Sequence, residues 1–360
     1  MTPPPLPARY TDYVRHTLKT RIPAILAMAG EGQDAAAARQ LGAIARAVAA
    51  DAPMLMDLRD WPIPGWEDLP GRVNGRRPSE AAFFDFEYWL YFRILMAVRY
   101  PETRADPFRL TKHRDLERHL DRAEQALQKT RTLADALNLA LDANAQDLSQ
   151  TSGPSGHHES GRDRLGIDPA GLRRLNIIAD NFGGEFMTDL LLATIAAEAG
   201  IEAVVHVKHL PMFVSDVTID DVIILFDRLR PGTAFGARLQ AQVAGGGLRI
   251  TSNAFWAAPQ FLDRMPVEEL EPGPGVLSVL KGDLNFRRAI GDLVVPVATP
   301  FDELPVLPAA PLLALRSIKS YCVAGMQDWP AGVSAEGFPT DGSIVTAQLI
   351  PGRPAPIACA

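Results

Sequence analysis

Cysteine is scarce in this chain of 360 residues, which has only Cys322 and Cys359. Two cysteines are too few for the disulfide framework of a small secreted protein. The N-terminal sequence MTPPPLPARY has neither the basic start nor the apolar stretch of a secretory signal. From these absences we expect a cytoplasmic protein.

Long apolar runs and a basic excess are also missing. The longest apolar stretches, such as 222–226, are far shorter than the roughly 20 residues that a membrane helix needs. The formal net charge is −7, with charges of both signs interspersed, whereas nucleic acids and anionic membranes bind clustered basic surfaces. We therefore expect a small-molecule ligand and neither a nucleic-acid nor a membrane partner. The sequence does not indicate an oligomeric state.

Three common catalytic motifs are absent as well. Neither GxGxxG after a strand nor GxxxxGK[ST] occurs, and there is no GxSxG elbow. His157 and His158 lie in a polar stretch that supplies no further metal ligand. His206 and His209 flank a lysine in a predicted strand and fit a buried or rim position better than a metal site.

The residues that are present predict a large α/β protein. Hydrophobic residues make up 47% of the chain, enough to bury a sizeable core. The pattern is helical through an N-terminal region, 1–148, and the polar segment 149–168 predicts a flexible linker or loop. In 169–360, short β-branched runs alternate with amphipathic stretches. We expect an α/β/α sandwich with a doubly wound, mostly parallel sheet. The predicted strands are LNIIAD, AVVHVKHL, LRITSN, VLSVLKG and LLALRS.

Polar residues that directly follow predicted strands are the first candidates for a site, because ligands of open parallel sheets bind beyond the carboxyl ends of the strands. Asp180 and Asn181 end the first core strand, and Asp216 follows the second. Carboxylate and amide oxygens are ligands that Mg²⁺ or Mn²⁺ prefers, and Glu185 could hold a metal-bound water. Each acidic position is equally typical of a helix N-cap, and the sequence leaves that alternative open.

Basic residues follow two later strands. Lys281, Asp283 and Asn285 cluster with Arg287 in KGDLNFRR, a combination that suits a phosphate. Arg316 and Lys319 are three apart and could point the same way on a helical turn to bind one anion. Basic residues are more often solvated surface than ligands. Together, however, the acidic and basic sites supply the metal ligands and cations that phosphoryl transfer needs.

Several blocks of the sequence resemble the metal-dependent damage-control phosphatases, specifically subfamily III, once described as acidic-residue (protein-glutamate) carboxyl methyltransferases. The resemblance spans about 175–326 and departs from the family pattern at Phe182, Gly184 and Phe286. In the helical half, FFDFEYWLYFRI is similar to a family helix, with Glu87, Tyr91 and Arg93 in step. The blocks that carry the resemblance are ADNFGGEFMTDLLLA, HVKHLPMFVSDVT, KGDLNFRRAIGD and APLLALRSIK.

The resemblance implies a metal-dependent phosphomonoester hydrolase of small phosphorylated metabolites, such as fructose phosphates. Asp180, Asn181 and Asp216 would hold a divalent metal (Mg²⁺, Mn²⁺, Co²⁺ or Ni²⁺), and Glu185 would assist its water. The residues implied to bind substrate or phosphate are Lys281, Asp283, Asn285, Arg316, Lys319, Glu87 and Arg93.

Three questions stay open at this stage. An S-adenosylmethionine-dependent protein carboxyl methyltransferase is an alternative function, although no glycine-rich loop for the methyl donor is found. A non-catalytic phosphometabolite-binding protein is another. Whether Asp180 attacks phosphorus or water attacks directly is not readable from the sequence.

Overall fold

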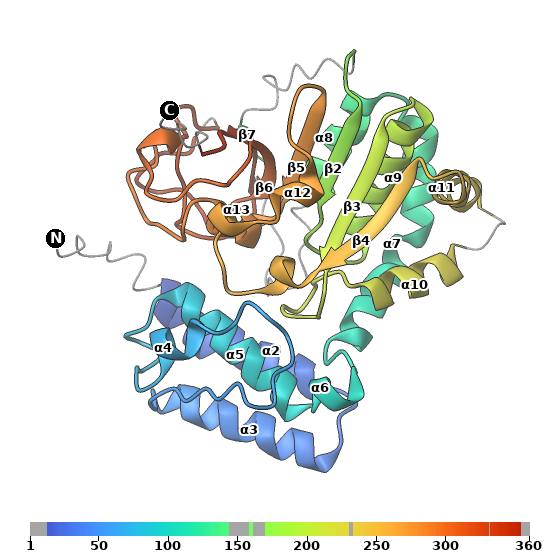
Figure 1. Ribbon diagram of the computed structural model, residues 1–360. Helices are drawn as coiled ribbons and strands as arrows, with labels where there is room; N and C mark the ends of the chain where they lie inside the picture. The colour runs from blue at the N-terminus through green and yellow to red at the C-terminus, as the bar shows by residue number, and fades with distance from the viewer. Residues whose placement is uncertain (1–12, 144–157, 161–169, 230–232, 331, 354–360) are drawn as a thin grey trace, which may run out of the picture.

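The N-terminal part of the computed structural model is helical, as predicted, and the structure describes residues 13–143, 158–160, 170–229, 233–330 and 332–353 (Figure 1). Residues 13–16 are α-helical and continue into a π-helical turn at Thr17–Arg21. It is followed by α2 (Ile22–Gly30), α3 (Ala35–Ala49), α4 (Leu69–Val73), α5 (Phe83–Ala97), α6 (Tyr100–Thr103), α7 (Arg109–Lys129) and α8 (Leu133–Ala143).

Helix α3 shows why these segments are helical. Its sequence is rich in alanine, the best helix former, and the Asp34 carboxylate caps it by accepting a hydrogen bond from the Ala37 N–H at 2.8 Å. Leu41, Ile44 and Val48 recur at helical spacing and are all buried. The helix therefore packs against the rest of the protein through one apolar face.

The C-terminal part is built on a seven-stranded sheet with the order β1-β7-β6-β5-β2-β3-β4. Neighbouring strands are parallel except β6 and β7, which are antiparallel. All five predicted strands are present, and β1 and β7 were not among them. The elements are β1 (His158–Ser160), β2 (Arg174–Ile178), α9 (Gly184–Glu198), β3 (Glu202–Lys208), α10 (Ile219–Arg228), α11 (Ala234–Ala244), β4 (Leu248–Asn253), α12 (Val267–Leu270), β5 (Val276–Lys281), α13 (Asp283–Ala289), β6 (Leu312–Ser317) and β7 (Ile344–Ile350).

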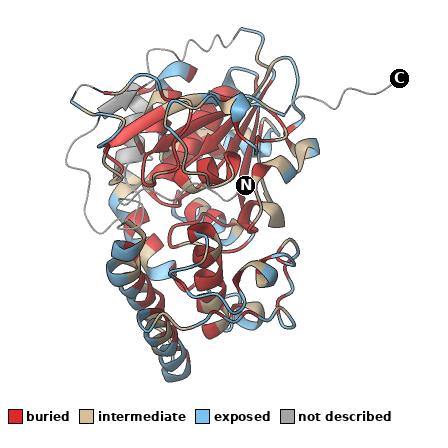
Figure 2. Cartoon of the chain, turned by 90° about the vertical axis from the view of Figure 1, so that its left-hand side faces the viewer, coloured by how far each residue is buried: buried red, intermediate tan, exposed pale blue. Residues whose placement is uncertain are grey.

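The central strands are buried on both faces, which explains their continuous apolar sequences (Figure 2). On β2, Leu175 and Ile177 belong to the hydrophobic cluster that includes α9, whereas Ile178 belongs to the cluster on the opposite face with Leu280 and α13. The sheet thus has a packed layer on each side, and the predicted α/β/α architecture is confirmed.

The helices that precede residue 148 contribute to two hydrophobic clusters. Helices α7 and α8 pack against α9, and Leu116, Leu137 and Leu141 lie in the same cluster as the sheet. Helices α2 to α6 form a second cluster. Within the predicted linker 149–168, only 158–160 are described, and they form β1; His157 lies outside the described residues. No helix in the described ranges is both long and apolar enough to cross a membrane.

The strand order places a topological switch between β2 and β5. From β2 the chain continues to β3 on one side, whereas β5 pairs with the other side of β2. The loops that follow β2 and β5 therefore diverge to opposite faces and leave a crevice at the carboxyl edge of the sheet. Asp180 lies in the loop after β2, and Asp283 is the first residue of α13, directly after the short connection from β5.

Candidate active site

The two acidic loops meet in the structure, although they are distant in the sequence. Asn181 and Asp216 form an antiparallel backbone bridge. It is flanked by a hydrogen bond from the Phe182 N–H to the Ser215 carbonyl at 2.6 Å and by one from the Val217 N–H to the Asp180 carbonyl at 3.1 Å. Because parallel strands β2 and β3 are neighbours, their loops start side by side, and the bridge then fixes their register.

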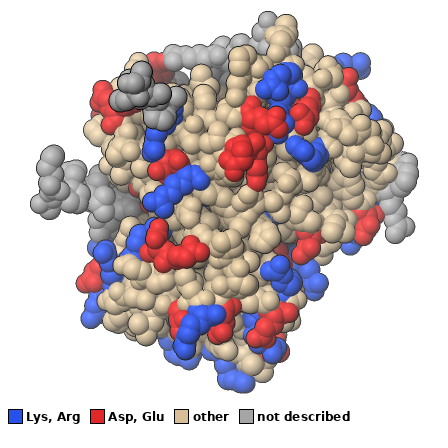
Figure 3. All heavy atoms as spheres, viewed as in Figure 1, with Lys and Arg blue, Asp and Glu red and all other residues tan. Residues whose placement is uncertain are grey.

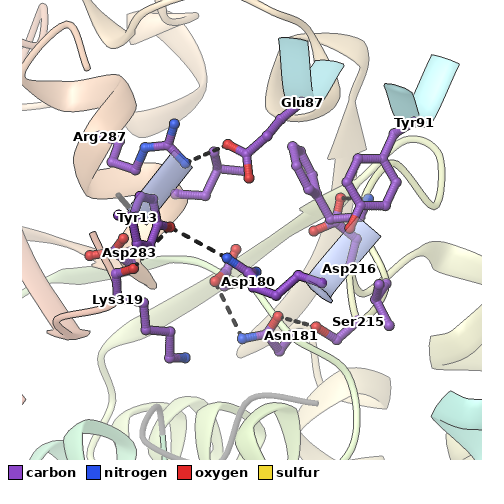
Figure 4. Close-up of a pocket in the computed structure, with 14 residues that line it drawn as sticks. Tyr13, Glu87, Tyr91, Asp180, Asn181, Ser215, Asp216, Asp283, Arg287 and Lys319 are labelled. Atoms are coloured by element: carbon purple, nitrogen blue, oxygen red, sulfur yellow. Dashed lines mark hydrogen bonds and ion pairs between the residues drawn. The ribbon is translucent and has the colours of Figure 1, made fainter. Parts of the chain in front are cut away.

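Hydrogen bonds join the side chains of Asp180, Asn181 and Ser215 in these loops (Figure 4). The Ser215 hydroxyl donates to Asn181 Oδ1 at 2.6 Å, and Asn181 Nδ2 donates to Glu185 Oε2 at 2.8 Å and to Asp180 Oδ2 at 3.3 Å. The Phe213 N–H donates to Asp216 Oδ2 at 3.0 Å. These bonds turn the Asn181 carbonyl oxygen away from Glu185.

Asp180, Asn181 and Asp216 offer two carboxylates and an amide oxygen, a donor set that fits a hard divalent cation. Burial raises the pKa of Asp216, and the Lys208 ammonium opposes that rise only in part. A bound cation would stabilise the charged form of this buried carboxylate. Among the described residues, no three His, Cys, Asp or Glu side chains form a metal-binding group, so the amide of Asn181 is essential to this fit.

A close approach of backbone and side chain positions Asp180. Gly282 follows β5 with φ of +89°, and a Cβ atom there would lie 1.8 Å from Asp180 Oδ2. Only glycine accommodates both the positive φ and the carboxylate. The other carboxylate oxygen, Asp180 Oδ1, lies 3.7 Å from the Lys208 ammonium nitrogen.

The opposite wall of the pocket comes from the helical part, from α13 and from the segment after β6. Arg287 Nη1 donates to Glu87 Oε2 at 2.6 Å, and Arg287 Nε donates to Asp292 Oδ1 at 2.6 Å. The Tyr13 hydroxyl donates to the Lys319 carbonyl at 3.2 Å. The residues that line the pocket are Tyr13, Arg21, Glu87, Tyr91, Asp180, Asn181, Phe213, Val214, Ser215, Asp216, Asp283, Leu284, Arg287 and Lys319.

The pocket therefore contains six of the predicted site residues, namely Asp180, Asn181, Asp216, Asp283, Lys319 and Glu87. Arg287 also lines it, four residues after Asp283 on α13. That spacing puts both side chains on one helix face, a signal the sequence did contain. Nothing in the sequence pattern marked Tyr13 and Arg21, which reach the pocket only through the packing of the helical part.

Two predicted phosphate-binding cations lie outside the pocket lining. Lys281 is fully buried, and its ammonium contacts Asp189 Oδ1 and the Ala140 carbonyl, each at 2.7 Å. Arg316 donates to Asp283 at 2.9 Å, with its guanidinium 3.4 Å from the centre of the Phe286 ring. Arg316 belongs to β6, so the helical turn expected for it and Lys319 is wrong.

The remaining predicted residues support the pocket or lie apart from it. Glu185 and Asn285 are buried and bonded to Asn181 and Lys208. Arg93 lines a different surface depression and donates to the Leu55 carbonyl at 3.3 Å. Glu87 and Arg93 are six residues apart on α5, which places their side chains about 120° apart around the helix axis. They therefore cannot serve the same pocket.

Known proteins show which family this chain resembles. The family model of the damage-control phosphatase ARMT1-like domain matches residues 19–332. The chain belongs to this family. It is 33% identical over 168 residues to damage-control phosphatase ARMT1 of Rattus norvegicus, a match that covers 43% of this chain and 38% of the rat protein. The human ARMT1 is 30% identical over 174 residues, covering 44% of this chain and 39% of the human protein.

The matches thus span less than half the length of these ARMT1 relatives. A solved structure of a DUF89 family protein from Pyrococcus horikoshii aligns with 87% of this chain and 92% of its own, with a TM-score of 0.43 and 13% identity.

Proposed function

We propose that this ARMT1-like chain is a metal-dependent phosphatase of small phosphorylated metabolites, with sugar phosphates as the substrate class. One observation carries the proposal: the two acidic loops and the cations Arg21, Arg287 and Lys319 line the same pocket. Metal ligands facing cations are what phosphoryl transfer requires. The names of the ARMT1 relatives, which are damage-control phosphatases, support the phosphatase activity in this proposal.

The residues would divide the work as follows. A divalent cation held by Asp180, Asn181 and Asp216 would supply Lewis-acid activation at phosphorus. Arg287 and Lys319 would bind the phosphoryl oxygens and stabilise the negative charge that grows on them in the transition state. Because Glu87 and Asp292 hold the Arg287 guanidinium from two sides, this cation is already oriented before substrate enters.

The outer wall of the pocket suits a polyhydroxylated substrate. The Glu87 carboxylate and the hydroxyls of Tyr13 and Tyr91 line it beside the apolar ring of Phe213. These groups can exchange hydrogen bonds with sugar hydroxyls, while an aromatic ring covers a C–H face. Burial raises the pKa of Tyr13 to about 12, so its hydroxyl stays protonated at neutral pH and keeps its hydrogen bond to the Lys319 carbonyl.

The decisive test is hydrolysis of a panel of phosphorylated sugars with Mg²⁺, Mn²⁺, Co²⁺ or Ni²⁺, in wild type and in Asp180→Asn and Asp216→Asn. We expect turnover that chelation abolishes and that each substitution lowers at least roughly hundredfold, since each removes a charged metal ligand. Asp302→Asn, an exposed carboxylate away from the pocket, is the control and should keep full activity.

Full activity of Asp180→Asn at saturating metal would contradict the assignment. Calorimetry with S-adenosylmethionine addresses the methyltransferase alternative, for which binding of that donor without metal-dependent phosphatase turnover is the signature. Tight binding of phosphorylated sugars without turnover in any metal would instead identify a binding protein.

A further inference from the structure

A buried lysine lies directly behind the acidic loops, at the end of β5. Lys281 Nζ contacts three acceptors: the Ala140 carbonyl at 2.7 Å, Asp189 Oδ1 at 2.7 Å and Glu185 Oε1 at 3.3 Å. An ammonium has three N–H bonds, so these contacts occupy all of its donors. The side chain is fully buried, as is that of Asp189. Lys281 therefore faces away from substrate.

Glu185 connects this lysine to the acidic loops. Its Oε1 faces Lys281, and its Oε2 accepts the hydrogen bond from Asn181 Nδ2 at 2.8 Å. Two partners on the two oxygens of one carboxylate fix its plane and rotation. A carboxylate only accepts hydrogen bonds, so Glu185 also decides which end of the Asn181 amide turns towards it.

The orientation of that amide matters for the cation. Only the carbonyl oxygen of Asn181 can be a ligand, because the amide nitrogen carries two hydrogens and would repel a metal. Ser215 does not select between the two orientations, since a hydroxyl both donates and accepts. The selection comes from the acceptors Glu185 and Asp180.

We propose that Lys281 is a positioning residue for the metal site: with Asp189 it holds Glu185, and through Glu185 it holds the Asn181 amide with its oxygen towards the cation. The proposal rests on the proposed function, because it presumes a cation at Asp180, Asn181 and Asp216. Groups behind metal ligands commonly act in this way, and their removal weakens metal affinity by roughly tenfold to hundredfold.

The experiment measures Mn²⁺ binding by calorimetry and thermal unfolding of the metal-free protein for Lys281→Met. We expect a metal affinity at least tenfold weaker than wild type. Lys112→Met is a matched control, because Lys112 is also fully buried between two carboxylates, Asp106 at 2.6 Å and Asp221 at 2.8 Å. The positive charge of Lys112 also acts on Asp216, where it opposes the rise in pKa that burial causes. The control should lose thermal stability to a similar degree without weaker metal binding.

Two further variants separate positioning from stability. Lys281→Met/Asp189→Leu removes the carboxylate that the single variant leaves uncompensated, and it should regain thermal stability but not metal affinity. In a Glu185→Gln background, Lys281→Met should weaken Mn²⁺ binding by much less than tenfold, because both residues act through one path. A double variant that recovers wild-type affinity, or fully additive effects, would overturn the proposal. Absence of Mn²⁺ binding in wild type would instead overturn the proposed function.

Discussion

At the scale of single residues, the pocket depends on atoms that nearly touch. Gly282 is the sharpest case, because the Asp180 carboxylate occupies the space where any other residue would place Cβ. The same glycine has a positive φ and follows β5 directly, so one position serves both the backbone turn and the acidic loop.

Gly282→Ala should therefore displace Asp180 and lower phosphatase activity and Mn²⁺ affinity by at least roughly tenfold, as loss of ligand geometry does elsewhere. The substitution also strains the backbone, at a cost of about 1 kcal/mol. Gly200→Ala is the matched control, since Gly200 has φ of +80° and open space around its would-be Cβ. Activity assays, calorimetry and denaturant unfolding compare the two. Equal activity in both variants would show that the contact with Asp180 is unimportant.

At the scale of elements, helix α9 carries the first acidic loop at its N-terminus, and a residue of another helix caps it. Gly183, the N-cap, has no side chain to offer, and Asp115 of α7 accepts a hydrogen bond from the Gly184 N–H at 3.3 Å instead. A Cβ on Gly183 would lie 1.9 Å from Asp115 Oδ2. The N-terminus of α9 therefore packs closely against Asp115 of α7, and a larger residue at Gly183 would disrupt this contact.

Asp115→Ala should remove this cap and lower the free energy of unfolding by about 1 to 2 kcal/mol, measured by urea titration. Asp115→Asn keeps an acceptor oxygen and should recover part of the loss. If Asp115→Ala is as stable as wild type, the N-terminus of α9 does not depend on α7.

The elements also show what the sequence could and could not predict. The parallel-sheet rule placed Asp180, Asn181, Asp216 and Asp283 correctly at one edge, because it needs only strand ends. The rule does not predict the face of the sheet to which a side chain points. Because the central strands are buried on both faces, their sequences lack the alternation of polar and apolar residues that would have placed Lys281. Strand β7 escaped prediction because the long segment before it, between β6 and β7, has no regular pattern.

At the scale of the whole molecule, the helical part and the α/β core share one pocket and one apolar junction. Leu210, Met212 and Val214, which follow β3, belong to the same cluster as α2 to α6. The next residues are the acidic loop of Asp216, so the junction directly supports the candidate metal ligands. Over the face in Figure 3, acidic and basic side chains are interspersed rather than gathered in one patch of either sign.

The stability of the whole fold should depend on a buried histidine of β3. His206 packs edge-on against Trp256, with Glu269 3.7 Å from its Nδ1. Burial, together with the charges of Arg174 and Arg249, lowers the pKa of His206 from 6.5 to about 4. The unfolded chain therefore binds a proton more readily than the folded one between these pH values, and stability falls as pH drops through this window.

From this group alone we expect the free energy of unfolding to fall by about 3 kcal/mol between pH 6.5 and pH 4. Denaturant titrations at several pH values measure the effect. His206→Gln has no titrating ring and should show a shallower slope over the same range. A slope identical to wild type in this variant would assign the acid sensitivity to other groups.

The backbone bridge between Asn181 and Asp216 joins two segments that are close in the order of synthesis. Both residues follow neighbouring strands that leave the ribosome one after the other, so a nascent chain can pair these loops early. Arg287 is synthesised later with α13, and Lys319 follows after β6. Of the three cations that line the pocket, Arg21 is thus synthesised before the carboxylates of Asp180 and Asp216, and Arg287 and Lys319 are synthesised after them.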